Sequence, residues 1–433
     1  MDSLSTLRQK IESLPKGNIY RKVIKGHEYW YHQYFLSGKR YSTLLAADEV
    51  EAYRNGIKLR KELEREWKRR IAAKRVTLSA RARELTGSLM AGDYCVAKFE
   101  HGNLLWMDEK RAPLMIKRTM SVEAFLSSRV IDSGRTNARL LKKALNIHET
   151  EESIVSLYAY GASIVDHFWF KPLNSRLTFA DICFDNDALF DLALNGDISL
   201  FPRKGILSPE LTTTGSFEKG WKRKDNSWWL YKKATKEEAF SELFCADAAR
   251  LFHVPSVAYE YEDGCVYSRN FAERFDFEPM IAIAGDDDSY EHVYECLVKY
   301  GENNQLQYLS LVLFDAVMNN VDRHNENCGL LRDRDTGEIL SLAPSFDCNL
   351  ALISRNRVLS ANPARDGLIQ LLVKFLKSVS SDIRCKIPEI IVTNEVLQDC
   401  LEKVPNELWP ENYGEILEAI EIRTKYLMDA IKR

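Results

Sequence analysis

The sequence predicts an α+β protein in which a β-rich part precedes an α-rich part, with two smaller regions ahead of both. From about residue 205, short apolar runs with strand character alternate with turn residues. From about residue 364 to the end, apolar residues follow helical spacing instead. A length of 433 residues fits two or three domains. We therefore expect three parts, at 1–82, 83–204 and 205–433.

Composition argues against several classes of protein. Hydrophobic residues make up 45% of the chain, yet no window of about eighteen apolar residues occurs. The chain begins Met1-Asp2-Ser3 without an apolar targeting segment. We therefore expect a cytoplasmic protein without membrane contact. The nine cysteines form no C-x-x-C pair, which favours reduced thiols over disulfides or a zinc site.

Charge is distributed unevenly along the chain. Residues 1–82 contain 19 Lys and Arg against 9 Asp and Glu, a net charge of +10, so the rest carries −13. Strands are predicted at 19–24, 28–35 and 40–45, followed by a charged helix over 48–75. Three strands and a basic helix resemble the small DNA-binding modules of some integrases and plant AP2-type factors. The pattern fits DNA binding through residues 1–82, or a protein-interaction or dimerisation module.

Residues 83–204 predict a mixed α/β region. Helical spacing occurs at 119–128 and 137–144, and 166–171 has strand character. No residues with catalytic spacing occur here, and the Trp and Phe side chains are typical of a core. We expect this region to pack on the C-terminal part as a regulatory or substrate-positioning domain.

The most informative segment is Asp322-Arg323-His324-Asn325-Glu326-Asn327, with Ser345-Phe346-Asp347 after it. The apolar run at 306–317 predicts a buried helix before the segment. Strands are predicted at 328–331 and 339–343, around a turn at 333–337. The order is therefore helix, polar loop, strand, turn and strand, with Asp347 on the exit loop.

Phosphoryl transfer from Mg-ATP needs the groups that this segment provides. One carboxylate accepts the proton of the attacking hydroxyl, and an amide and a second carboxylate hold metal ions that bridge the phosphates. We assign Asp322 as the catalytic base and Asn327 and Asp347 as Mg²⁺ ligands. Arg323 and His324 are expected to hold the loop backbone. A solvated salt-bridge cluster, with Asp347 as a turn former, is the alternative.

A second set of residues is expected to bind the nucleotide. Lys232 lies on an apolar strand, and Glu242 lies on the following helix, where it can pair with that lysine. Lys233 is the competing lysine, but side chains alternate along a strand, and Lys232 shares its face with Leu230, which suits an adenine pocket. The other expected contacts are the phosphate-loop residues Thr214, Gly215 and Ser216, within 212–220, and the hinge residues Ser268 and Asn270, within 266–271.

Four segments together resemble the HipA-type serine/threonine kinases of bacteria. They are the D-x-H-x-x-N loop at 322–327, the P-x-[FY]-D context of the metal acid at 344–347, the helix at 241–255 ending in V-P, and the E-R-F-D sequence at 273–276. The resemblance covers about residues 205–433. It implies a bilobal protein-kinase-like fold, ATP and Mg²⁺ as cofactors, and transfer to a Ser or Thr hydroxyl of a protein substrate.

The resemblance also implies regulation. Some members phosphorylate a serine in their own phosphate loop and so become inactive; Ser216 is the closest counterpart here, with Thr212, Thr213 and Thr214 beside it. Members are often toxins of toxin–antitoxin systems, so an antitoxin partner is expected.

Two other functions remain open. D-R-H-N-x-N also occurs in phosphoinositide-type lipid kinases, but there the later acid belongs to D-F-G, whereas Asp347 is followed by Cys348-Asn349. A pseudokinase regulator fused to a DNA-binding module is the other alternative, and the intact acid–amide–acid set disfavours it.

Overall fold

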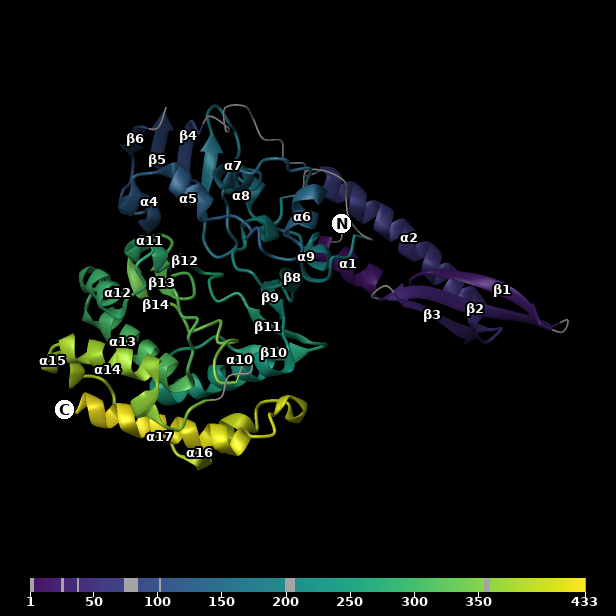
Figure 1. Cartoon of the computed structure of the whole chain (residues 1–433). Helices are drawn as coiled ribbons and strands as arrows, with labels where there is room; N and C mark the ends of the chain where they lie inside the picture. Colours follow the sequence, from purple (N-terminus) through teal and green to yellow (C-terminus); the bar gives the residue numbers. More distant parts are fainter. Residues whose placement is uncertain are drawn as a thin grey trace.

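The computed structural model describes residues 4–24, 27–36, 39–73, 85–100, 103–198, 207–353 and 359–432 (Figure 1). It is a mixed α/β structure with four sheets, whose neighbouring strands pair antiparallel. The expected domain boundaries at 82/83 and 204/205 lie outside the described residues.

The N-terminal region is a three-stranded sheet packed on a long helix. Its elements are α1 (Leu4–Glu12), β1 (Asn18–Ile24), β2 (His27–Leu36), β3 (Lys39–Leu45) and α2 (Glu49–Ala73). The three strands form where the sequence predicts them, and the last expected helical residues, 74–75, lie outside the described part. One sheet face packs on α2: His32 on β2 is buried, and its ring centroid lies 5.0 Å from that of Tyr53 on α2. Figure 1 shows this unit projecting from the rest of the chain.

The next region holds a four-stranded sheet in the order β6-β5-β4-β7, flanked by short helices. The elements are β4 (Gly87–Ala91), β5 (Tyr94–Glu100), β6 (Asn103–Trp106), α4 (Leu114–Thr119), α5 (Val122–Ser127), α6 (Ala138–Ala144), α7 (Glu152–Leu157), β7 (Phe168–Pro172), α8 (Phe179–Ile182) and α9 (Phe190–Asn195). The helix expected at 119–128 forms over Val122–Ser127, and the chain is interrupted between it and α4. Met120 is left-handed, with φ 54°, and the Ser121 hydroxyl starts a new helix by accepting a hydrogen bond from Ala124 N at 3.1 Å.

A second four-stranded sheet follows, in the order β10-β11-β9-β8. The elements are η1 (Pro209–Thr212), β8 (Lys219–Lys224), β9 (Ser227–Lys233), α10 (Lys236–Ala248), η2 (Ala249–Phe252), β10 (Tyr259–Glu262) and β11 (Cys265–Arg269). Strand β8 was not predicted, because its run of charges obscures the strand pattern and 212–220 was assigned to a loop. Asp225 and Asn226, with φ 51° and 62°, form the two-residue turn that joins β8 to β9.

The C-terminal part is mainly helical, as the sequence predicts, with a three-stranded sheet β12-β13-β14. The elements are β12 (Phe275–Pro279), α11 (Ile281–Ala284), α12 (Tyr290–Leu297), η3 (Val298–Tyr300), α13 (Glu302–Met318), β13 (Gly329–Asp333), β14 (Ile339–Leu342), η5 (Pro363–Arg365), α14 (Gly367–Ser378), α15 (Ser381–Arg384), α16 (Asn394–Leu401), η6 (Asn406–Leu408) and α17 (Tyr413–Ile431). The buried helix α13 ends just before the D-R-H-N-E-N segment, so the packed core fixes where that segment begins.

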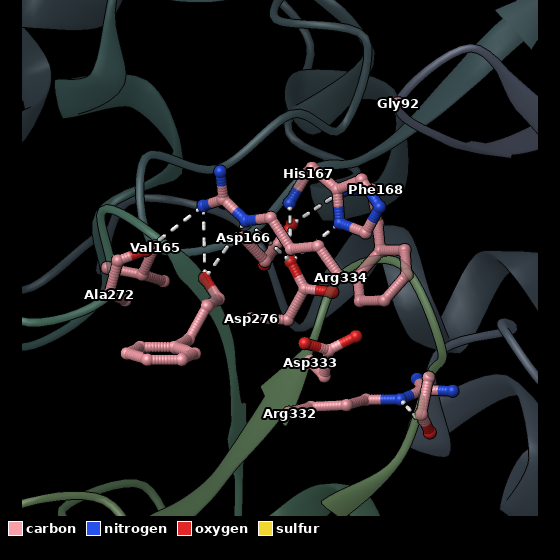
Figure 2. Close-up of polar contacts among 12 residues, drawn as sticks. Gly92, Val165, Asp166, His167, Phe168, Ala272, Asp276, Arg332, Asp333 and Arg334 are labelled. Atoms are coloured by element: carbon pink, nitrogen blue, oxygen red, sulfur yellow. Dashed lines mark hydrogen bonds and ion pairs between the residues drawn. The ribbon is translucent and has the colours of Figure 1, made fainter.

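A buried polar network joins the β4–β7 region to the β12–β14 sheet (Figure 2). The Asp276 carboxylate accepts hydrogen bonds from His167 N at 3.0 Å and His167 Nδ1 at 2.6 Å, and Arg334 lies 3.5 Å from it. Phe277 N donates to the carbonyl of Val165 at 2.9 Å. These contacts fix the two regions against each other, which matters because both line the same cavity.

No helix in the described part of the chain is long and apolar enough to cross a membrane. The nine cysteines are all free thiols.

Candidate active site

A cavity of about 520 Å³ collects most of the residues that the sequence singles out. Its lining includes Thr212, Thr213, Thr214, Gly215, Ser216, Lys232, Ser268, Asn270, Asp322, His324, Asn327 and Asp347. Glu242 and Arg323 do not line the cavity, but they hydrogen-bond to the backbone of the loops that do. The side chains converge from β9, β11, the loop before β8 and the two loops that flank the β13–β14 hairpin.

Lys232 enters the cavity from β9 and forms its shortest ion pair with Asp347. The Nζ–Oδ1 distance is 2.8 Å, whereas Lys232 Nζ lies 3.9 Å from Glu242 Oε1. Burial would lower the pKa of Lys232, but Asp347 and Glu242 outweigh it and raise the pKa to about 12. Burial would raise the pKa of Asp347, but Lys232 and Lys219 hold it at about 2. Lys233 is exposed, as strand alternation requires.

Glu242 pairs with Lys232 at the longer distance of 3.9 Å, as the sequence predicts, and it also contacts the Asp347 backbone. Its Oε1 accepts a hydrogen bond from Asp347 N at 3.1 Å, and Tyr259 Oη lies 3.3 Å from the same amide. Asp347 adopts the left-handed conformation, with φ 61°, which costs energy for a residue with a Cβ. Burial raises the pKa of the Glu242 carboxyl. Glu242 and Tyr259 thus hold the Asp347 backbone in a strained position beside Lys232.

Arg323 joins the two loops that carry the acid–amide–acid set. Its guanidinium makes a two-pronged contact with Asp315 on α13, at 2.8 and 3.0 Å. It also donates to the carbonyls of Asn327 at 2.6 Å and Phe346 at 2.7 Å. The arginine and Asp315 are both nearly inaccessible to solvent. Arg323 therefore fixes the spacing between the Asp322–Asn327 loop and the Asp347 loop.

The residues present fit a hard divalent cation that also binds phosphates. Asn327 Nδ2 donates to the Asp322 carbonyl at 3.0 Å, so the amide oxygen points away from that bond, and Oδ1 accepts no hydrogen bond from the described residues. Asp347 supplies a carboxylate. Among the described residues no three His, Cys, Asp or Glu side chains form a metal-binding cluster. One carboxylate and one amide suit Mg²⁺, which keeps other positions for phosphate and water.

Three residues of the site were missed by sequence reasoning. Tyr259 and Asp315 act through long-range contacts with no local signal in the sequence. Lys219 lines the cavity, and burial together with Lys232 and Arg135 lowers its pKa to about 7 against the attraction of Asp347. A signal for Lys219 existed: it lies four residues after Gly215, at the end of the Gly-, Ser- and Thr-rich stretch.

The part of the chain that carries the site is similar to a known domain family. Residues 205–406 match the family model of the HipA-like C-terminal domain. No curated protein matches the chain. Among solved structures, the chain is similar to the proinflammatory kinase CtkA of Helicobacter pylori, with 16% identity, a TM-score of 0.40 and coverage of 49% of this chain and 92% of CtkA.

A second similar structure is the toxin–antitoxin protein HipA of Shewanella oneidensis MR-1, determined with HipB and operator DNA. It has 11% identity and a TM-score of 0.44, over 79% of this chain and 97% of that one. The family model spans the 212–220 loop, Lys232, the Asp322–Asn327 loop and Asp347. Residues 205–406 are therefore similar in sequence to the HipA-like C-terminal domain.

Proposed function

We propose that the chain is an ATP- and Mg²⁺-dependent serine/threonine protein kinase of HipA type, with a bilobal kinase fold over 205–433. One observation carries the proposal: Asp322, Asn327, Asp347 and Lys232, from three separate segments, line a single cavity. An acid, an amide, a second acid and a paired lysine are the groups that phosphoryl transfer requires.

Each residue has a role that follows from its contacts. Asp322 accepts the proton of the acceptor hydroxyl as the phosphorus–oxygen bond forms. Lys232, held by Asp347, binds the nucleotide phosphates, and Lys219 adds a second cation in the same cavity. Asn327 and Asp347 would hold Mg²⁺, which neutralises phosphate charge when bound. Ser268 and Asn270 line the nucleotide side of the cavity, and His324 with Arg323 supports the loop.

The regulatory role is proposed at the level of the family. The protein is a cytoplasmic toxin of a toxin–antitoxin system, opposed by an antitoxin, and it phosphorylates a protein on Ser or Thr. Autophosphorylation falls on the phosphate loop, among Thr212, Thr213, Thr214 and Ser216. Residues 83–204 regulate the site or position the substrate, a role supported by Ser163 and Val165, which line the same cavity.

The test compares wild type with Asp322→Asn in transfer from labelled ATP to protein substrates and, separately, to phosphoinositide vesicles. We expect transfer to protein, reduced by at least about a hundredfold in the variant, because the group that accepts the proton is lost. ATP binding by the variant, measured by calorimetry, serves as the folding control. Equal transfer by the two proteins would contradict the assignment of the base, and transfer to lipid alone would favour the lipid-kinase alternative.

DNA binding by residues 1–82 is a second proposed function, which the free face of the β1–β3 sheet favours. Alternation along β2 turns Tyr29, Tyr31 and Gln33 away from α2, against which His32 packs. Tyr20 stacks on Tyr31 with ring centroids 5.3 Å apart. The face also carries exposed Lys22 and Arg40 and, among its described residues, no Asp or Glu. Exposed rings interleaved with cations suit a polyanion whose bases lie in a groove.

The test is fluorescence anisotropy of labelled random duplex DNA with the full chain at several salt concentrations. We expect affinity that falls with salt, and at least a tenfold loss in the double variant Lys22→Glu, Arg40→Glu. The matched control is Lys374→Glu, Lys377→Glu, which makes the same charge change on α14. No binding at low salt, or equal binding by both double variants, would leave the module to a protein partner.

A further inference from the structure

The loop at 213–218, which lines the cavity before β8, is held by an arginine from outside the HipA-like domain. Arg135 Nη2 donates to the carbonyl of Thr213 at 2.8 Å, and Arg135 Nε donates to the carbonyl of Gly215 at 3.3 Å. The Arg135 side chain is buried, with 1% of its residue surface exposed. It precedes α6 and lies 70 residues before the start of the family match at residue 205.

The two carbonyls that Arg135 binds determine where the neighbouring amides point. A trans peptide group is planar, so its C=O and the following N–H point in opposite directions. Holding the carbonyls of Thr213 and Gly215 turns the N–H groups of Thr214 and Ser216 to the other side. Within the described part of the chain, neither N–H donates to a protein group, and both residues line the cavity. Successive free amides of this kind form a concave anion site.

The surroundings of Arg135 fix it in place. Ile131 N donates to the Leu211 carbonyl at 2.8 Å, and the Thr136 side chain is hydrogen-bonded to Glu218. Burial lowers the pKa of Arg135 to about 10, against the attraction of Glu210 among other acids, so it remains charged at neutral pH. Residues 131–136 therefore contact the chain just before the loop, at Leu211, and the end of the loop, at Glu218. Arg135 contacts the residues between them.

We propose that Arg135 is a positioning residue that presents the amides of Thr214 and Ser216 to the phosphates of a bound nucleotide. The proposal rests on the nucleotide-binding function proposed above. It makes the region before residue 205 part of the nucleotide site, although Arg135 itself touches only the loop. It also assigns the arginine to the phosphate end of the nucleotide and not to the base or ribose.

The experiment measures binding of ATP, ADP and adenosine to the full chain by titration calorimetry. In Arg135→Ala we expect ATP and ADP to bind about 10- to 100-fold more weakly, the loss that follows when hydrogen bonds to a charged group are not made. Adenosine has no phosphates, so its affinity stays within about twofold of wild type. Arg135→Lys keeps the cation and reaches one carbonyl, so it restores part of the ATP affinity. The exposed Arg139, four residues further on, provides the control variant Arg139→Ala.

Two results would overturn the proposal, and both differ from a failure of the proposed function. Unchanged ATP affinity in Arg135→Ala would show that the loop keeps its shape without the arginine. A matching loss of adenosine affinity in both Arg135→Ala and Arg135→Lys would show a general structural role. Full ATP affinity in Arg135→Lys beside a large loss in Arg135→Ala supports the loop-holding role. A wild-type chain that binds neither ATP nor ADP would instead overturn the kinase proposal itself.

Discussion

Lys232 and Asp347, 115 residues apart in the chain, meet at 2.8 Å inside the cavity. The lysine lies next to the last residue of strand β9, and the acid is a left-handed loop residue whose amide donates to Glu242. Both groups are buried, and each is the strongest attractive electrostatic partner of the other. The pair therefore ties the sheet β10-β11-β9-β8 to the loop that follows β14.

The two adjacent lysines of β9 provide a matched test of this pair. Lys232→Met should lower phosphotransfer by at least about a hundredfold, because a phosphate contact and the partner of Asp347 are both lost. Lys233→Met should stay within about twofold of wild type, since Lys233 is exposed. Steady-state transfer from labelled ATP measures both. Greater damage from Lys233→Met would mean that the other lysine binds phosphate.

The arginine between the two loops should matter for stability as well as for activity. Arg323→Met leaves Asp315 buried without its partner, and breaking a buried pair in this way costs about 3–5 kcal/mol. Urea denaturation measures the change in the free energy of unfolding. Lys386→Met serves as the control, because its pair with Glu302 is half exposed on both sides and such pairs contribute about 0–1 kcal/mol. Similar losses of unfolding free energy in the two variants would show that the buried Arg323–Asp315 pair contributes no more than an exposed pair.

The buried Lys219 should make stability depend on pH. Its pKa is about 7 in the folded protein against 10.5 in the unfolded chain, so between these values the unfolded chain binds more protons. The free energy of unfolding that Lys219 contributes therefore rises with pH from 7 upward, by at most about 1.4 kcal/mol per pH unit. Urea denaturation at pH 7, 8 and 9 should show the wild type gaining stability relative to Lys219→Met. If the unfolding free energies of wild type and Lys219→Met change in parallel with pH, Lys219 stays charged in the folded protein. The control is Lys236→Met, at an exposed lysine.

Autophosphorylation should select among the loop hydroxyls by their accessibility. Thr212 is 5% exposed, and the Thr213 hydroxyl already donates to the Pro209 carbonyl at 2.7 Å and accepts from Trp221 Nε1 at 2.9 Å. Thr214 and Ser216 are exposed. After incubation with ATP and Mg²⁺, mass spectrometry should find phosphate on Thr214 or Ser216, and none in the Asp322→Asn protein. Phosphate on Thr212 or Thr213 alone would require the loop to unfold first.

Local pattern predicted much of the fold around the site. The apolar run before Asp322, the turn residues 333–337 and the strands on either side gave the order of elements from α13 to β14. Strand alternation placed Lys232, and not Lys233, toward Leu230 and the cavity. These predictions worked because hydrophobic periodicity and turn chemistry depend on neighbours in the chain.

The rest depended on contacts between distant residues. Lys232 pairs with Glu242 at 3.9 Å as expected, but the closer pair at 2.8 Å, with Asp347, was not predicted because it joins residues 115 positions apart. Strand β8 was missed because its pairing with β9 overrides a run of charged residues. Arg135 gave no local signal, since its carbonyl partners lie about eighty residues further along the chain.

The polar junction in Figure 2 has a consequence for how the molecule comes apart. Arg332, from β13, donates to the Ala112 carbonyl at 2.8 Å, and Glu278, from β12, accepts from Leu114 N at 3.1 Å, both out of contact with water. Separating the β4–β7 region from the C-terminal part would leave the buried carboxylates of Asp276 and Glu278 without their hydrogen-bond partners. We therefore expect the described parts of 85–198 and 207–432 to unfold on heating in a single cooperative transition, and not in two separate ones.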